Sequence, residues 1–403
     1  MTIDAARPTG IATDRLRRID DHLTSYVDHG RLAGWHVRVS KGGTVIHDSM
    51  RGLRDREADL PIAADTLYRI YSMTKPVTSV AAMMLYERAE LSLNDPVSKF
   101  IPSFADLQVY VGGPAAKPVT RPATEPMRVK HLLTHTSGLT YGFHHTHVTD
   151  EIMRLAGQEF GPPAGMDLAA ACDSWAAMPL RFDPGTGWNY GVSTDVLGRV
   201  VEVVSGSSLA EFFASEITGP LGMGDTAFRA VDADRLAALY ALGPNGVVRY
   251  DAFGNGALKT PDMLSGGGGL VSSMDDYWRF TEMLRRGGEL DGARLLSDRT
   301  VRFMASNHLP AGADLEQFGI PLYAETPFSG VGFGLGFSVT IDPQAAALAS
   351  SVGEYGWGGL ASTYFWVDPV EDLTAILMTQ LMPSSAYPVR QELKQLVYGA
   401  LAD

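Results

Sequence analysis

Ser72 and Lys75 are the two residues of this sequence whose types and spacing could do nucleophilic chemistry, since Ser72 is the only serine with a lysine three places later. Apolar residues follow with helical spacing over 77–85, and Pro76 is tolerated only in the first turn of a helix, so a helix should begin close to Ser72. Residues i and i+3 share a helix face. The pattern predicts a serine nucleophile beside a lysine base, although the pair alone leaves open a surface lysine at a helix start.

A lysine base requires a depressed pKa. A free lysine has a pKa of ~10.4, so only ~0.04% is neutral at pH 7, and a useful base must lose roughly 3 units, or about 4 kcal/mol. Burial on an apolar helix face disfavours the ammonium, and so does the positive end of the helix dipole. We therefore expect Lys75 to be buried.

The histidines do not form a recognisable metal motif. His131 and His135 have the i, i+4 spacing of a zinc helix, but Leu132 stands where the general-base glutamate would be. A second cluster, His144-His145-Thr-His147, lacks the aspartate and the last histidine of its nearest zinc pattern, because Thr149 stands in the aspartate's place. We expect no catalytic metal and no organic cofactor.

Other motifs also point away from alternative chemistries. The run Ser265-Gly-Gly-Gly-Gly-Leu270 has no following Gly-Lys-Ser/Thr, so it predicts close backbone packing and not a phosphate cradle. The Gly-x-Ser-x-Gly elbow of the α/β-hydrolases is absent. The single cysteine, Cys172, lies in an apolar stretch and is expected to be a small buried residue.

Composition fits a globular protein of 403 residues, with 45% hydrophobic and 20% charged residues. The formal net charge of −13 argues against nucleic acid and anionic membranes as partners. Residues 1–10 contain no apolar signal-peptide core, and no apolar run approaches the ~18 residues of a membrane span. We expect a cytoplasmic protein.

The elements that must position this chemistry come from both ends of the chain. A helix is expected over 14–30, a hairpin over 35–50, strands over 336–341, 363–367 and 373–379, and a last helix over 389–400. Strand patterns vanish in the middle, where proline- and glycine-rich loops are expected at 111–126, 157–165 and 309–336. The fold class expected is α/β (α+β): an antiparallel sheet built from both termini and flanked by helices (1–80 and 255–403), with an inserted, mostly helical domain (81–254).

Five motifs in order resemble the serine β-lactamase-like superfamily, which includes penicillin-binding proteins, class C β-lactamases and family VIII carboxylesterases. They are Ser72-Met-Thr-Lys75, the segment 129–139 (Val-Lys-His-Leu-Leu-Thr-His-Thr-Ser-Gly-Leu), Pro184-Gly-Thr-Gly-Trp-Asn-Tyr190, Gly266-Gly-Gly-Gly-Leu-Val-Ser272 and Trp357-Gly358-Gly359. The resemblance spans about residues 30 to 380. It implies an antiparallel sheet beside a helical domain, with the active site in the cleft between them.

The resemblance also implies roles for individual residues. Ser72 would be the nucleophile, Lys75 its general base, and Tyr190 the residue that shuttles the proton. The third motif implies an oxyanion hole made by the N–H groups of Leu360 and Ser72. Further substrate contacts would come from the rest of that motif and from a cleft tyrosine, namely Trp357, Gly358, Gly359 and Tyr141.

Two departures from the penicillin-recognising pattern favour an esterase. Val192 replaces the asparagine of Tyr-x-Asn, and Trp357 replaces the cation that precedes Thr-Gly in those enzymes. An indole cannot grip a substrate carboxylate. The function expected is hydrolysis of short to medium acyl esters through an acyl-enzyme on Ser72. A β-lactamase or D-aminopeptidase, an acyltransferase using the same site, and an inactive binding homologue stay open, as do the natural substrate and the oligomeric state.

Overall fold

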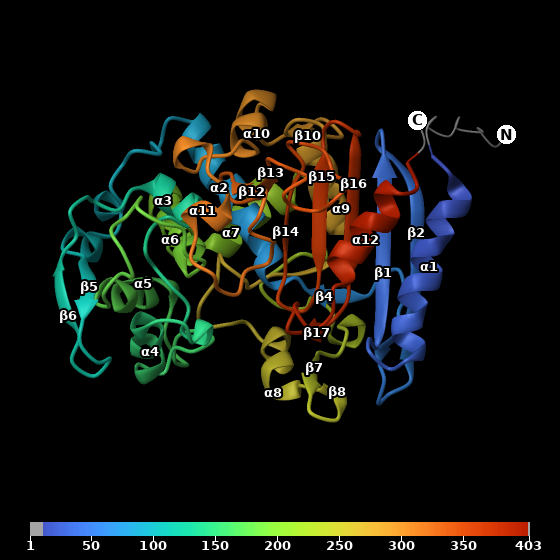
Figure 1. Cartoon of the computed structure of the whole chain (residues 1–403), viewed down its shortest axis with the longest axis horizontal. Helices are drawn as coiled ribbons and strands as arrows, with labels where there is room; N and C mark the ends of the chain where they lie inside the picture. The colour runs from blue at the N-terminus through green and yellow to red at the C-terminus, as the bar shows by residue number, and fades with distance from the viewer. Residues whose placement is uncertain (1–10, 402–403) are drawn as a thin grey trace.

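A large antiparallel sheet, to which both ends of the chain contribute, dominates the computed structural model, which describes residues 11–401 (Figure 1). The N-terminal segment in which we expected no signal peptide lies outside the described residues. The strands run in the order β12 (Val331–Phe333), β13 (Ser338–Thr340), β14 (Tyr355–Gly358), β15 (Tyr364–Asp368), β16 (Leu373–Met378), β1 (Gly34–Lys41), β2 (Thr44–Asp55) and β3 (Leu60–Pro61). The predicted fold class is confirmed.

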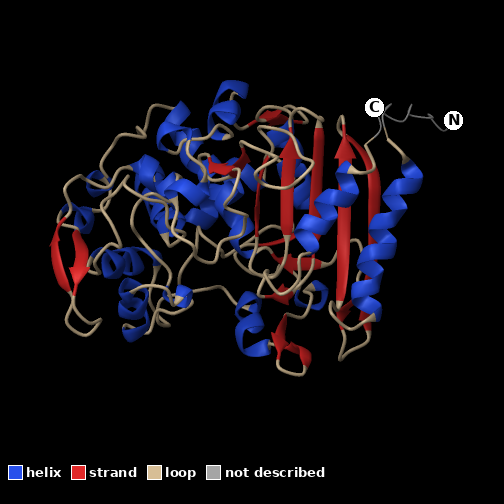
Figure 2. Ribbon diagram, in the orientation of Figure 1, coloured by secondary structure: helices blue, strands red, loops and turns tan. Residues whose placement is uncertain are grey.

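Helices cover both faces of this sheet (Figure 2). Helices α1 (Thr13–Asp28) and α12 (Val389–Tyr398) pack together on one face, and α9 (Met274–Arg285) packs on the other. The alternation along β1 decides which side chain meets which layer. Trp35, Val37 and Val39 join the apolar cluster under α1 and α12. On the opposite face Ser40 accepts a hydrogen bond of 2.7 Å from Trp278 of α9.

The remaining helices form most of the second part of the molecule, to the left in Figure 1. Helices α2 and α6 pack against each other at its centre. The helices outside the sheet layers are α2 (Thr74–Glu87), α3 (Val129–Leu133), α4 (Val148–Leu155), α5 (Leu168–Ala176), α6 (Ser193–Ser205), α7 (Leu209–Phe213), α8 (Asp251–Gly254), α10 (Asp298–Met304) and α11 (Leu315–Phe318). No helix within residues 11–401 has both the length and the apolar character needed to cross a bilayer.

Short strands occur in the middle of the chain, where we expected none. A hairpin of β5 (Gln108–Gly112) and β6 (Val119–Pro122) overlaps the expected loop 111–126, and β7 (Tyr240–Gly243) pairs with β8 (Gly246–Arg249). The expectation that strand patterns vanish in the middle was wrong because these strands are only four or five residues long and none alternates regularly between buried and exposed positions. The other short pairs are β4 (Leu67–Arg69) with β9 (Val271–Ser273), β10 (Glu289–Leu290) with β11 (Ala293–Arg294), and β7 with β17 (Leu381–Met382).

The two parts of the chain meet where α2 begins. The 3-10 turn Tyr71–Met73 precedes α2 and contacts β14 of the large sheet. The pairing of β7 with β17 places residues near 240 beside the part of the chain that forms the large sheet. The domain limits at 80 and 254 stay a prediction. This junction places the end of one sheet strand beside the start of one helix, where the candidate motifs lie.

Candidate active site

Ser72 lies on a 3-10 turn immediately before α2. The preceding residue, Tyr71, has a φ of 42°, a left-handed conformation that is rare for a side chain of this size and is typical of functional turns. Pro76 is the third residue of α2, where the missing N–H costs no helical hydrogen bond. The helix therefore begins next to Ser72, as the sequence predicted.

Lys75 is buried, with 1% of its surface exposed, and its ammonium group is held by three oxygen atoms. Nζ lies 3.2 Å from Ser72 Oγ, 3.0 Å from the Tyr141 hydroxyl and 2.7 Å from the carbonyl oxygen of Gly267. Burial lowers the pKa of Lys75 to about 8, against the opposing attraction of Asp195 and Glu325. The serine and the lysine are thus in contact, and the amine is unusually easy to deprotonate.

Tyr190 lies beside both residues and approaches Lys75 through its ring. Lys75 Nζ is 4.6 Å from the centre of the Tyr190 ring, and the direct hydrogen bond of the amine goes to Tyr141. Burial raises the pKa of Tyr190 well above its usual value, opposed by hydrogen bonds to Ser72 and Trp357. Tyr190 is therefore a neutral phenol within reach of the Ser72 hydroxyl, and Tyr141 is closer to the amine than the sequence led us to expect.

Trp357 lies behind Tyr190 and does not line the cavity. It belongs to β14, its side chain is fully buried, and Nε1 donates a hydrogen bond of 3.4 Å to the Tyr190 hydroxyl. We expected this indole to contact substrate, and the structure corrects that expectation. Strand β14 pairs with β15 on one side and turns the indole into the core, so it positions the phenol instead.

The segment after Trp357 presents Leu360 to the cavity. Gly358 and Gly359 allow close packing, since a Cβ on Gly359 would lie 2.2 Å from the Ile70 carbonyl oxygen. Leu360 lines the cavity near Ser72, and among the residues that the structure describes no acceptor takes the hydrogen of its N–H. The two glycines bring this segment close to Ile70, and the oxyanion role of Leu360 stays a prediction.

Two further residues of the site, Asp195 and Glu325, are not indicated by the sequence patterns. Asp195 in the first turn of α6 accepts hydrogen bonds from Ser265 Oγ (2.5 Å) and from the N–H of Gly267 (3.0 Å), and burial raises its pKa. This fixes Gly267, whose carbonyl orients Lys75. Glu325 comes from the expected loop 309–336 and lines the same cavity. The sequence did contain one signal for this region, the glycine run 265–270. Its predicted close backbone packing here places the Gly267 carbonyl oxygen against Lys75.

The histidine clusters serve the packing around the site. His135 is buried with its ring centre 5.0 Å from that of Tyr190, and burial lowers its pKa well below the usual value. Burial also lowers the pKa of His144 to about 4. Within residues 11–401 no three His, Cys, Asp or Glu side chains gather as metal ligands would. Both histidines are neutral and contribute shape to the site.

A cavity of about 210 Å³ opens above Ser72. Its walls are aromatic and acidic, and neither lysine nor arginine is among them. The ring-bearing lining residues are Tyr71, Tyr141, Phe143, Phe160, Trp175, Tyr190, Phe253 and Tyr323, and the carboxylates are Glu159, Asp195 and Glu325. Val192, which stands where the penicillin-recognising pattern has an asparagine, adds an apolar wall. The lining is thus mainly aromatic, and it includes no basic side chain that could bind an anionic substrate group.

Comparison with known proteins agrees with this geometry. Residues 19–398 match the family described as Beta-lactamase. Esterase EstB of Burkholderia gladioli is 32% identical over 432 residues, covering 99% of this chain and 100% of EstB. Acyltransferase calJ of Penicillium decumbens is 29% identical over 379 residues, covering 91% of this chain and 87% of calJ.

A solved structure extends the agreement to the fold. EstCE1, a hydrolase with promiscuous acyltransferase activity, superposes with a TM-score of 0.81 at 27% identity, covering 96% of this chain and 98% of EstCE1. The match therefore spans the sheet and the helical part together. With the family match over nearly the whole chain and the Ser72–Lys75 contact, this chain belongs to the β-lactamase family of serine hydrolases.

Proposed function

We propose that this protein is a carboxylesterase that hydrolyses short to medium acyl esters through an acyl-enzyme on Ser72. The observation that carries the proposal is the 3.2 Å contact between Lys75 Nζ and Ser72 Oγ at the floor of an apolar cavity. A related esterase, EstB, supports the substrate class by its name. Lys75 acts as the base and Tyr190 relays the proton.

The hydrogen bonds around Lys75 suit a base. A neutral amine keeps two N–H donors and one lone pair. The Gly267 carbonyl can only accept, so it takes one N–H, and the Tyr141 oxygen can take the other. The lone pair then remains for the proton of Ser72. Burial contributes to the lower pKa that makes this neutral form accessible.

The reaction proceeds in two balanced steps. Ser72 Oγ forms a bond to the ester carbonyl carbon while its proton passes to Lys75, directly or through the Tyr190 hydroxyl. The N–H groups of Leu360 and Ser72 stabilise the oxyanion. The C–O bond to the alcohol breaks, and the alcohol leaves with the proton. Water then attacks the acyl carbon and gives a proton to the same base. The bond from the acyl carbon to Ser72 Oγ breaks, and the base passes that proton to Oγ, which releases the carboxylic acid and free Ser72.

The cavity wall supports esters without a carboxylate near the scissile bond. Because the lining includes three carboxylates and no basic side chain, an anionic group would gain no charge-assisted hydrogen bond there. Acyl transfer to an alcohol in place of water is a second candidate, favoured by the 27% identity to EstCE1, a hydrolase with acyltransferase activity. Both reactions share the acyl-enzyme.

The test compares p-nitrophenyl acetate and butyrate with a chromogenic cephalosporin, for wild type and Ser72→Ala. We expect kcat/KM for the esters to exceed that for the cephalosporin by at least roughly a hundredfold, or ~2.7 kcal/mol. Ser72→Ala should stay folded by circular dichroism and lose at least roughly a thousandfold in kcat. Butanol added to the assay should yield butyl ester if acyl transfer occurs. Equal rates on the two substrate classes, or an active Ser72→Ala, would overturn the proposal.

A further inference from the structure

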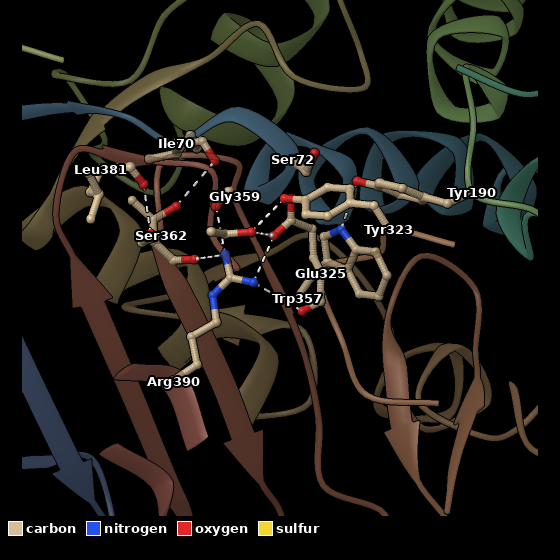
Figure 3. A network of polar contacts seen from close by, with 12 residues as sticks. Ile70, Ser72, Tyr190, Tyr323, Glu325, Trp357, Gly359, Ser362, Leu381 and Arg390 are labelled. Carbon is tan, nitrogen blue, oxygen red and sulfur yellow. Dashed lines mark hydrogen bonds and ion pairs between the residues drawn. The ribbon is translucent and has the colours of Figure 1, made fainter. Parts of the chain in front are cut away.

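Arg390, in the first turn of α12, joins three separate segments next to the site (Figure 3). Its Nη1 donates to Glu325 Oε2 at 2.7 Å and to the Glu325 carbonyl oxygen at 3.2 Å. Its Nη2 donates to the carbonyl oxygens of Gly359 at 2.6 Å and Thr363 at 2.8 Å. The side chains of both ion-pair partners are largely buried, at 13% and 1% exposure. One guanidinium therefore connects α12, the loop that carries Glu325, and the β14–β15 turn.

The β14–β15 turn needs such support. It contains Ser362 with a φ of 65°, a strained conformation for a residue other than glycine. The backbone bond from the Gly359 N–H to the Thr363 carbonyl closes the turn, and Ser362 Oγ bonds the Leu381 carbonyl oxygen. Arg390 binds both ends of this turn. Leu360, whose N–H faces the cavity in the proposed mechanism, lies between them.

We propose that Arg390 is a positioning residue that holds the Leu360 N–H at the oxyanion position, and that it does not bind substrate. This inference rests on the proposed esterase function. Both terminal nitrogens of the guanidinium already donate to protein oxygens, and Glu325 neutralises its charge. Although Arg390 lies directly behind the cavity wall, it has neither free charge nor a free terminal nitrogen for a substrate carboxylate.

The geometry requires arginine in particular. A planar guanidinium presents its N–H groups as a rigid fork, whereas a lysine ammonium is a compact point charge on a flexible stem. Lysine at 390 could pair with Glu325 but could not hold Gly359 and Thr363 at the same time. The conservative substitution should therefore preserve the buried charge pair and release the turn.

The test measures kcat and KM of Arg390→Lys on p-nitrophenyl butyrate, together with the rate at which a fluorophosphonate labels Ser72. We expect kcat and the labelling rate to fall together by about 10- to 100-fold, the size of losing part of an oxyanion hole, while KM changes by less than about threefold. In Arg390→Ala, methylguanidinium should restore part of kcat. It can enter through a second cavity of about 350 Å³ that Arg390 lines from the other side.

Arg285→Ala is the matched control. Arg285 is buried to a similar extent, at 10% exposure, and is paired with Glu282 and Asp372 at the opposite end of β15. We expect this variant to lose stability but to keep the wild-type kcat at a temperature where it is folded.

Three outcomes would overturn the inference while leaving the esterase proposal intact: Arg390→Lys with kcat within twofold of wild type, an effect on KM alone, or an equal kcat loss in Arg285→Ala. If folded Arg390→Ala shows no response to methylguanidinium, the positioning role is also rejected. A wild type that neither turns over esters nor is labelled at Ser72 would instead reject the proposed function itself.

Discussion

In the proposed mechanism Lys75 sets the chemistry of this site, because its amine is buried beside Ser72. Burial lowers its pKa to about 8, so about a tenth of the side chains are neutral at pH 7. Asp195 and Glu325 oppose this shift, which keeps the pKa from falling further. The same burial disfavours the ammonium in the folded state, and so activity and stability should depend on pH in linked ways.

We predict that kcat/KM for an ester rises with pH through about 8 and levels off above it, because the neutral amine is the base. Lys75→Met should lose at least roughly a thousandfold in kcat, as expected for removing the base that activates a nucleophile. A pH–rate profile from pH 6 to 10 on p-nitrophenyl butyrate tests both expectations. A flat profile would contradict Lys75 as the base.

Stability provides an independent readout of the same pKa. The folded-state pKa of Lys75 lies below the unfolded value, so the penalty for burying the ammonium is complete below pH 8 and fades as pH rises to about 10.5. Wild type should therefore gain about 3 kcal/mol of unfolding free energy from Lys75 between pH 7 and 10.5. Lys75→Met lacks this gain, so its unfolding free energy should fall behind that of wild type by the same amount over this range. Urea unfolding of both proteins at several pH values measures this difference, and a constant difference would refute the buried ammonium.

At the scale of elements, two aromatic side chains of the cavity lining come from segments that lie far apart in the sequence. Phe160 lies in the expected glycine-rich loop 157–165 and Phe253 in α8, and their ring centres are 5.6 Å apart in an edge-to-face contact. Phe160 also stacks on Phe143, at 5.7 Å, and remains 56% exposed. Because Phe160 lines the cavity and is also exposed to solvent, we expect this loop and this short helix to narrow the entrance to Ser72.

We predict that Phe160→Ala widens the entrance. The kcat/KM ratio of 1-naphthyl acetate to ethyl acetate should rise by at least about fivefold, which corresponds to removing a steric barrier of roughly 1 kcal/mol. Stability should change little, since the side chain is half exposed. Val352→Ala, at a position that is 61% exposed, serves as the control and should leave the ratio unchanged. An unchanged ratio in Phe160→Ala would show that the aromatic contact does not limit access.

At the scale of the whole molecule, the two ends of the described chain lie together. Ile11 and Leu401 form an antiparallel bridge, the Ala12 N–H donates to the Ala400 carbonyl oxygen at 2.9 Å, and α1 packs against α12. The sheet therefore depends on the pairing of β1 with β16, two strands from opposite ends of the sequence. We therefore expect the fold to tolerate a change in where the chain begins and ends, provided that β1 and β16 can still pair.

A circular permutant tests that inference. Joining the two ends and opening the chain between Ala116 and Lys117, two exposed residues of the β5–β6 turn, should keep kcat within about threefold, since exposed loop tips tolerate new termini. Opening it between Ser362 and Thr363 instead should abolish activity, because that cut severs the turn held by Arg390. Retained activity in the second permutant would contradict the importance of that turn.

The sequence by itself determined the features that depend on local spacing. Ser72 and Lys75 meet because residues three positions apart at the start of a helix lie on the same face. Pro76 indicates where that helix begins. Alternation and helical periodicity are also local patterns, and they predicted the strands and helices near both ends of the chain. The short hairpin β5–β6 was missed because neither strand alternates regularly between buried and exposed positions.

Only the tertiary structure decided the features that depend on contacts between distant segments. Asp195, Glu325 and Arg390 come from α6, a long loop and the last helix, and no spacing in the sequence relates them to Ser72. Trp357 shows most clearly what a sequence motif does not predict. The motif marks it as part of the site, but the pairing and facing of β14 decide that its indole supports Tyr190 and does not touch the cavity. A side chain's neighbours across a fold depend on packing in three dimensions, which local sequence patterns do not encode.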